Sequence, residues 1–279
     1  MVNNSKAAQP LYLLLIVLSQ VFCSYFLAFK NNWTDVFDKL HLSIYSTTIF
    51  SLFFFFFINN LISPSNSNDE GKSKKLFNLV FSILFGGAAL LSGYLSFYKL
   101  GLLVSLILML QLLYALFIKR LPILGNVLIA SLNSMSLLVL IAFDPNIKPY
   151  LILAFTIFIF GIHFIIDFIK DILNNRDQTI SGNYTLPAIA GNKVSRIFLI
   201  AFLFIYILVL TTSVRLIMVK YFSAPLSYVF LAYNILCVGI PLFRILSKLQ
   251  TGNESADYKY LYQVACYTLV TGIFSMMFF

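Results

Sequence analysis

Long apolar segments alternate with short polar connections along the whole chain, and this pattern predicts the architecture. Each segment approaches the ~20 residues that a helix needs to cross ~30 Å of hydrocarbon. The segments are too long for barrel strands, and the two-residue alternation typical of such strands is absent. The sequence therefore predicts an all-α integral membrane protein, a bundle of about nine transmembrane helices. The predicted spans are residues 10–29, 42–62, 77–97, 100–118, 123–143, 149–170, 195–214, 222–243 and 259–278.

Two of the polar connections are long, and both are expected on the same face of the membrane. They comprise residues 63–76 and 171–194 and follow the second and sixth predicted spans. This spacing of four spans suggests a duplicated four-helix half, although the residues themselves show no repeat. Since no stretch has the composition of a soluble domain, residues 1–279 are predicted to form a single transmembrane domain. The phenylalanine run 53–57 indicates a lipid-facing or packing surface.

The composition excludes an ordinary soluble domain. Hydrophobic residues make up 60% of the chain and charged residues 10%, whereas soluble domains have roughly 45–50% and about 25%. The cysteines, Cys23, Cys237 and Cys266, all fall within predicted spans, so no disulfide framework is expected. The N-terminal residues lead into a span of full length without a small-residue cleavage site, which predicts a retained first helix.

The net charge of +9 is unevenly distributed between the two faces of the predicted bundle. Most basic residues lie in the N-terminus and in the connections after even-numbered spans. By the positive-inside rule, the N-terminus lies in the cytoplasm and the C-terminus on the opposite side of an inner or cell membrane. This clustering at a membrane face argues against nucleic acid as a partner. The first group is Lys6, Lys72, Lys74, Lys75, Lys119, Arg120, Lys170, Arg176, Lys193, Arg196, Arg244, Lys248 and Lys259, and the second is Lys30, Lys39, Lys99, Lys148, Arg215 and Lys220.

Candidate chemistry gathers at the end of the sixth predicted span. His163, Asp167 and Asp171 are spaced four residues apart, so on a helix they share one face at its cytoplasmic end. Two carboxylates one turn apart could hold a hard cation such as Mg²⁺, and Asp177 could supply a third oxygen from the loop. Zinc is not predicted, because no second His or Cys lies near His163. The alternative is a helix end whose aspartates are neutralised by Lys170 and Arg176.

The same region resembles a known family. Residues 167–191 resemble the second signature of the UbiA superfamily of intramembrane prenyltransferases. Residues 114–126 are similar to the family segment Tyr-x-x-x-x-Lys-Arg-x-Pro-x-x-Gly-Asn. The nine predicted spans, the cytoplasmic N-terminus and the two long polar loops also suit this family. The residues at matching positions of the second signature are Asp167, Lys170, Asp171, Gly182, Thr185, Leu186, Pro187 and Gly191.

The resemblance implies a bundle around a central cavity and a prenyl transfer reaction. A prenyl diphosphate would be bound through Mg²⁺ held between two aspartate-rich motifs, and its prenyl group would pass to an aromatic or other lipophilic acceptor. Cationic side chains and metal would stabilise the charge on the leaving diphosphate. The catalytic residues implied are Asp167 and Asp171 for the cation, Lys119 and Lys170 for the diphosphate, and Tyr114 as a polar cavity group.

The chain departs from the family in its first aspartate-rich motif. With the motif's Asn placed on Asn59, Asn60, Ser63 and Ser67 stand where the three aspartates belong. In the second motif, an amide replaces an expected aspartate at Asn174 and at Gln178. Neutral oxygens supply none of the charge that holds a divalent ion, so a weakened Mg²⁺ site is expected. The substrate-binding residues predicted on this basis are Asn59, Asn60, Arg120, Arg176, Asp177 and Asn174.

Two functions therefore remain open on the sequence. One is a working prenyltransferase with a metal-poor site, and the other is a catalytically degenerate relative that binds an isoprenoid lipid, a quinone or a partner without turnover. The lysines and arginines of the motifs could clamp a diphosphate directly or serve as positive-inside anchors. A transporter or channel is disfavoured, because the charge clusters at one surface rather than near the bilayer midplane.

Overall fold

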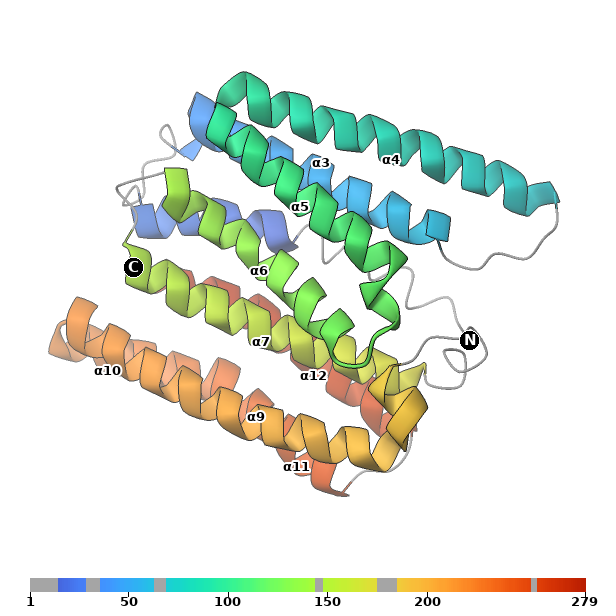
Figure 1. The fold of residues 1–279 in the computed structure, drawn as a ribbon. Coiled ribbons are helices and arrows are strands. Elements are labelled where there is room, and N and C mark those ends of the chain that lie inside the picture. Colours follow the sequence, from blue (N-terminus) through green and yellow to red (C-terminus); the bar gives the residue numbers. More distant parts are fainter. Residues whose placement is uncertain (1–14, 29–35, 63–68, 144–147, 175–184, 252–254) are drawn as a thin grey trace. The chain divides into compact units, whose positions relative to one another are not determined.

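The computed structural model consists of helices that fall into two compact units (Figure 1). Within the described residues there is no β-strand. The structure describes residues 15–28, 36–62, 69–143, 148–174, 185–251 and 255–279. The first unit comprises Met1–Tyr25 and Asn31–Lys119, and the second comprises Phe26–Lys30 and Arg120–Phe279.

The described helices have the lengths and compositions of membrane spans. Seven of them are long and apolar enough to cross a bilayer, and two shorter apolar helices cover Leu15–Leu27 and Leu124–Leu140. Each of the nine predicted spans overlaps one of these helices. The prediction of an all-α integral membrane protein is therefore confirmed, whereas the single domain over residues 1–279 stays a prediction.

In the first unit, α3 (Lys39–Ile62) packs against both α4 (Asp69–Ser96) and α5 (Tyr98–Leu116). Aromatic rings fill much of the α3–α4 contact: Phe57 stacks on Phe85 with ring centroids 5.6 Å apart, and Phe53 stacks on the same ring at 4.9 Å. Since Phe53 is still 39% exposed, the phenylalanine run is a packing surface that also faces outward.

The polar loop predicted at 63–76 is too long. α4 begins at Asp69, so only the residues before it can form the connection. Lys72, Lys74 and Lys75 lie within the helix, and lysine is a good helix former. Polarity alone was therefore a poor guide to where this helix begins.

In the second unit, α7 lies at the centre and packs against α6, α9 and α12. Most of its side chains are buried. The elements of this unit are α6 (Leu124–Phe143), α7 (Pro149–Leu173), α9 (Leu186–Tyr221), α10 (Ala224–Asn234), the π-helix η3 (Ile235–Gly239), α11 (Ile240–Thr251), α12 (Ser255–Phe274) and the 3-10 helix η4 (Ser275–Phe278).

Two glycines allow aromatic rings to pack closely between α7 and its neighbours. A Cβ atom on Gly161 would overlap the ring of Tyr206, whose hydroxyl donates to the carbonyl of Phe158 at 2.6 Å. A Cβ atom on Gly272 of α12 would overlap the ring of Phe158 itself. Small residues at helix contacts permit this kind of close packing inside a membrane.

The loop predicted at 171–194 is also shorter than expected, because α9 begins within it at Leu186. Thr185 has extended backbone angles, and Pro187 lies in the first turn, where its missing N–H costs nothing. Gly191 then interrupts the helix with φ 78° and ψ 167°, a conformation that L side chains rarely adopt. The Thr-Leu-Pro segment therefore starts a short helical turn, and the glycine separates it from the long span.

Candidate functional site

The end of α7 carries an ion pair against an aromatic ring. Lys170 Nζ lies 3.1 Å from Asp167 Oδ1, and both side chains are partly buried. The same ammonium lies 5.8 Å from the ring centroid of Tyr262 on α12. Lys170 is thereby held between a carboxylate and an aromatic face. The sequence alternative in which Lys170 neutralises Asp167 describes this contact correctly.

Asp171 is held by a different helix. Asn126 Nδ2 donates to Asp171 Oδ2 at 2.9 Å, and Asn126 is only 9% exposed. Asn126 is the final residue of the Tyr114–Asn126 segment, and Asp171 belongs to the second aspartate-rich signature. The two segments recognised in the sequence therefore meet at one hydrogen bond between α6 and α7.

A turn with a positive φ precedes α6, three residues before Asn126. Ile123 has φ 63°, which is an outlier for a β-branched residue. The N–H of Leu124 donates to the carbonyl of Pro122 at 2.6 Å, which closes a γ-turn of the rare form with a positive central φ. Strain of this kind persists where the surrounding structure imposes it, and often at functional sites.

His163 lies in the interior of the second unit. It is 2% exposed, and its Nδ1 lies 3.3 Å from Nδ2 of Asn133 on α6. Among the described residues, no group of three or more His, Cys, Asp or Glu side chains could hold a metal ion. The structure thus offers no zinc cluster in its described part, and a third carboxylate from Asp177 lies outside the described residues.

In the first unit, Tyr114 and Asn59 meet at Phe55. The ring of Tyr114, which is 8% exposed, lies 5.4 Å from that of Phe55. Asn59 Nδ2 donates to the carbonyl of Phe55 at 3.1 Å, and its Oδ1 is buried with no hydrogen-bond partner among the described residues. One turn before Tyr114, Gln111 donates to Ser51 Oγ on α3 at 2.9 Å.

Some of the remaining predicted site residues are described by the structure, and others lie outside the described residues. Asn60 is half-buried in the last turn of α3, and Lys119 belongs to the 3-10 helix η2 (Ile118–Arg120). Asn174 is exposed directly after α7, and its N–H donates to the carbonyl of Lys170 at 2.9 Å. The side chain of Arg120 and the residues Ser63, Ser67, Arg176, Asp177, Gln178 and Gly182 lie outside the described part of the structure.

Sequence reasoning missed two features of this site. Asn126 was recognised only as part of a motif, and its role as the partner of Asp171 depends on how α6 packs against α7. Tyr262 carried no signal, because it is one of 16 tyrosines and lies far from the motifs in the chain. Its contact with Lys170 arises only from the packing of α12 on α7.

The side chains at the end of α7 suit one hard cation. Asp167 and Asp171 are one helical turn apart, and their oxygens are the ligand type that Mg²⁺ prefers. The hydrogen bond from Asn126 orients Asp171, as partners of metal-ligating carboxylates commonly do. Within the described residues Asp167 and Asp171 could each offer an oxygen to Mg²⁺, and water or phosphate oxygens would have to complete its shell.

Comparison with known proteins identifies the family. The model of the UbiA prenyltransferase family matches residues 70–269, which is most of the chain. The chain belongs to the UbiA prenyltransferase family. No curated protein matches the sequence significantly.

Solved structures of UbiA-family proteins share the fold of this UbiA chain. A digeranylgeranylglyceryl phosphate synthase matches with a TM-score of 0.70 and 16% identity, over 96% of this chain and 95% of that protein. A UbiA homologue from Aeropyrum pernix K1 gives 0.63 and 11%, over 95% and 97%. A UbiA homologue from Archaeoglobus fulgidus bound to DMAPP and Mg²⁺ gives 0.61 and 12%, over 96% of each chain. At these identities the likeness shows the fold.

Proposed function

We propose that this UbiA-family protein transfers a prenyl group from a prenyl diphosphate to an aromatic or other lipophilic acceptor within the membrane. The observation that carries the proposal is the Asn126–Asp171 hydrogen bond, which joins two family segments beside the Asp167–Lys170 pair. A UbiA homologue of the same fold binds DMAPP or GPP together with Mg²⁺, which supports the same substrate class here.

Asp167 and Asp171 would hold one Mg²⁺, which when bound supplies positive charge opposite the diphosphate. In the reaction the allylic C–O bond breaks, the diphosphate leaves with the electron pair, and the acceptor loses a proton as it takes the prenyl group. Lys170, fixed by Asp167 and Tyr262, contributes a second cation at the same helix end. Asn126 keeps Asp171 in a single orientation.

The other predicted residues have supporting roles in this proposal. Lys119 would bind the diphosphate, Tyr114 would act as a polar cavity group, and the amides would offer neutral oxygens. Asp177 would add a third carboxylate to the metal, and the arginines would bind the diphosphate. The residues proposed to line the substrate site are Asn59, Asn60, Asn174, Arg120, Arg176 and Asp177.

The proposal is tested by measuring diphosphate release from geranyl, farnesyl and geranylgeranyl diphosphate by the purified protein, with and without Mg²⁺. We expect Mg²⁺-dependent release that Asp171→Asn abolishes. Asp38→Asn is the matched control, because Asp38 caps the first turn of α3 through the His41 N–H and Asn is an equally good cap. Absence of release from all three substrates would refute the transferase.

A catalytically degenerate relative is the second candidate, and the end of α3 favours it. There Asn59 and Asn60 provide amides, and the Asn59 nitrogen is committed to the carbonyl of Phe55 in its own helix. Such a protein would bind an isoprenoid lipid, a quinone or a partner without turnover. Mass spectrometry of the purified protein would then detect a bound isoprenoid or quinone, while release of diphosphate stays at background.

For the orientation we propose a cytoplasmic N-terminus and a C-terminus on the opposite side of the membrane. The excess of lysine and arginine in the connections after even-numbered spans supports it. A cysteine introduced as Ser73→Cys should react with a membrane-impermeant thiol reagent in inverted vesicles and stay unlabelled in intact cells. Labelling only in intact cells would reverse the orientation.

A further inference from the structure

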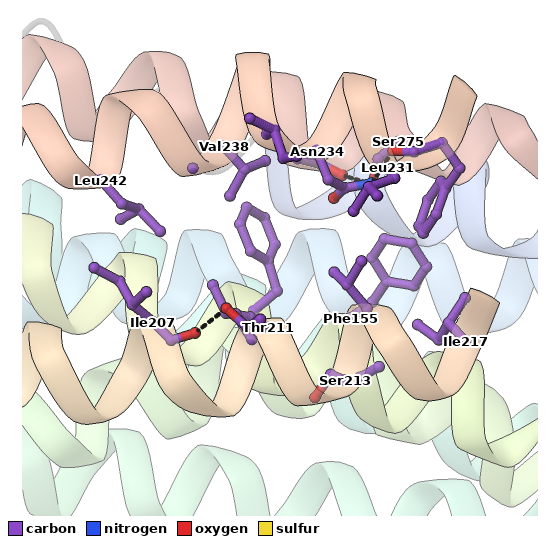
Figure 2. Close-up of a pocket in the computed structure, with 18 residues that line it drawn as sticks. Phe155, Ile207, Thr211, Ser213, Ile217, Leu231, Asn234, Val238, Leu242 and Ser275 are labelled. Carbon is purple, nitrogen blue, oxygen red and sulfur yellow. Dashed lines mark hydrogen bonds between the residues drawn. The ribbon is translucent and has the colours of Figure 1, made fainter. Parts of the chain in front are cut away.

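The second unit contains a cavity at the end of α7 opposite to Asp167 and Asp171. It has a volume of about 150 Å³ and lies between α7, α9 and the continuous helix formed by α10, η3 and α11. In Figure 2, Ile207, Thr211 and Ile217 on α9 face Leu242, Val238 and Leu231 across it. Phe155, which lines the cavity, precedes Asp171 by 16 residues, or about 24 Å along the helix axis.

The cavity wall is suited to a hydrocarbon chain. Its lining is mostly apolar, and its polar groups already donate to backbone carbonyls of their own helices: Thr211 to Ile207 at 2.8 Å and Ser275 to Gly272 at 2.6 Å. An apolar cavity of similar volume stays dry. Only 17% of the most apolar 18-residue stretch of α9 is buried, so much of this helix is left uncovered by the described residues.

The π-helix η3 shapes one wall of this cavity. Ile235, Val238 and Gly239 of η3 all line it. π-Helical segments are rare and often occur at functional sites. The hydroxyl of Thr271 donates to the carbonyl of Cys237 at 2.8 Å, which satisfies a backbone group within the irregular segment. The local widening of the helix is therefore supported by a specific contact from α12.

Two lysines lie one to two helical turns beyond the cavity at the same end of the unit. Lys220 follows the cavity residue Ile217 by one turn on α9, and Lys148 precedes α7. Their contacts are reciprocal: Lys220 Nζ lies 3.7 Å from the ring centroid of Tyr150, and Lys148 Nζ lies 5.0 Å from that of Tyr221. Two cations are thus gathered across the α7–α9 contact.

Aromatic contacts connect this lysine pair to the cavity. The ring of Phe279 lies 6.1 Å from that of Phe155 in the cavity and 6.5 Å from that of Tyr221 under Lys148. Both lysines are exposed, and neither forms an ion pair within the part of the chain that the structure describes. An aromatic face attracts an ammonium without cancelling its charge, so among the described residues both lysines keep their positive charge at the rim.

We propose that this cavity and its lysine rim bind one anionic phospholipid. One hydrocarbon chain enters the groove between α9 and α10, and the phosphate lies against Lys148 and Lys220. The apolar cavity then suits the hydrocarbon chain of a bilayer lipid, and the two lysines suit its negative charge. Tyr150 and Tyr221 are residues typical of the headgroup level of a membrane. The site is separate from the Asp167–Asp171 chemistry, and its occupancy does not depend on prenyl transfer.

The test measures lipid binding to the purified full-length protein by native mass spectrometry and by the shift in thermal unfolding. The probes are phosphatidylglycerol, phosphatidylcholine with the same chains, and inorganic phosphate. We expect phosphatidylglycerol to bind about 25-fold more tightly than phosphatidylcholine, since each lysine near a headgroup contributes about fivefold. Inorganic phosphate should give no shift at the same concentration.

Substitutions test the lysine rim and the cavity independently. Lys148→Gln with Lys220→Gln should abolish the preference for phosphatidylglycerol, whereas Lys99→Gln, an exposed lysine on α5 of the first unit, should leave it intact. Gly239→Phe fills the groove, because its Cβ would meet only the Asn234 carbonyl at 3.6 Å, and it should weaken both lipids. Gly87→Phe adds the same ring to α4, where nothing lies within 4 Å, and should weaken neither.

Three results would overturn the proposal. The first is equal binding of both lipids to the unsubstituted protein, a comparison that needs no variant to fold. The second is an unchanged lipid preference after removal of both lysines. The third is concentration-dependent self-association that Gly239→Phe abolishes while lipid binding persists, since a second copy of the chain would then occupy the groove.

Discussion

The ends of α3 and α7 stand four spans apart in the chain, yet they carry different kinds of side chain. α3 ends in amides, and the nitrogen of Asn59 donates back to Phe55 in its own helix at 3.1 Å. α7 ends in carboxylates, and Asp171 accepts from Asn126 on another helix at 2.9 Å. At the α7 end a carboxylate therefore accepts a hydrogen bond from another helix, whereas at the α3 end a neutral amide donates within its own helix.

This difference indicates which of the two helix ends can hold a cation unaided. Affinity for a hard divalent ion depends on the number and charge of its oxygen ligands. Asp167 and Asp171 supply two negative charges within one turn, and the amides of α3 supply none. We expect metal binding to rest on α7 and the α3 end to contribute only dipoles.

The largest effect is expected from removing the carboxylates of α7. Asp167→Asn combined with Asp171→Asn should lower the apparent affinity for Mg²⁺ by at least about 100-fold, because loss of a mere partner of a ligand already costs about 10–100-fold. Asn60→Ala should change the apparent affinity for Mg²⁺ by less than about threefold, which is close to the net contribution of one neutral hydrogen bond. Titration of Mg²⁺-dependent diphosphate release measures both. Equal losses in the two variants would remove the asymmetry.

The next effect is expected at Asn126. Asn126→Leu deletes the donor to Asp171 and should reduce turnover by about 10–100-fold, as loss of such partners does. Asn133→Leu is the matched control on the same helix, because Asn133 contacts His163 instead. Steady-state kinetics at saturating Mg²⁺ distinguish the two. If both variants lose activity alike, the effect comes from α6 as a whole rather than from Asp171.

Carboxylates added after α3 should remove the difference in metal binding between the two helix ends. Asn60→Asp, Ser63→Asp and Ser67→Asp together restore the carboxylates expected in the first motif and should tighten Mg²⁺ binding by about tenfold, since added charge strengthens such sites. The matched control is Asn60→Gln, Ser63→Asn and Ser67→Asn, which enlarges the same side chains without charge. Competition with Mn²⁺ followed by electron paramagnetic resonance reports the affinity. No difference between the triple variants would mean that charge does not limit this end.

The smallest effect is expected at Tyr262. Tyr262→Leu removes the ring beside Lys170, and since a cation–π contact contributes about 0.5–1 kcal/mol at accessible sites, KM for the prenyl diphosphate should rise by about two- to fivefold. Tyr262→Phe keeps the ring and should match the unsubstituted protein. A rise in KM for Tyr262→Phe as well would assign the effect to the hydroxyl.

The spans were predictable because membrane helices obey a simple constraint on length and polarity. Their ends were not, since α4 begins within a polar stretch and the start of α9 depends on Thr185 and Pro187. The α7 face with Asp167 and Asp171 followed from helical spacing alone. The partners of that face did not, because Asn126 and Tyr262 reach it only through the packing of other helices.

The rings that fit against Gly161 and Gly272 have a consequence for how the second unit coheres. In a bilayer, lipid tails solvate an apolar helix as well as another helix does. Hydrophobicity alone therefore does not keep α7 at the centre of the second unit. The Tyr206 and Phe158 rings occupy the space that a side chain would fill. Cohesion here depends on shape, because a single methyl group on either glycine would overlap a ring and force the ring or its helix to move.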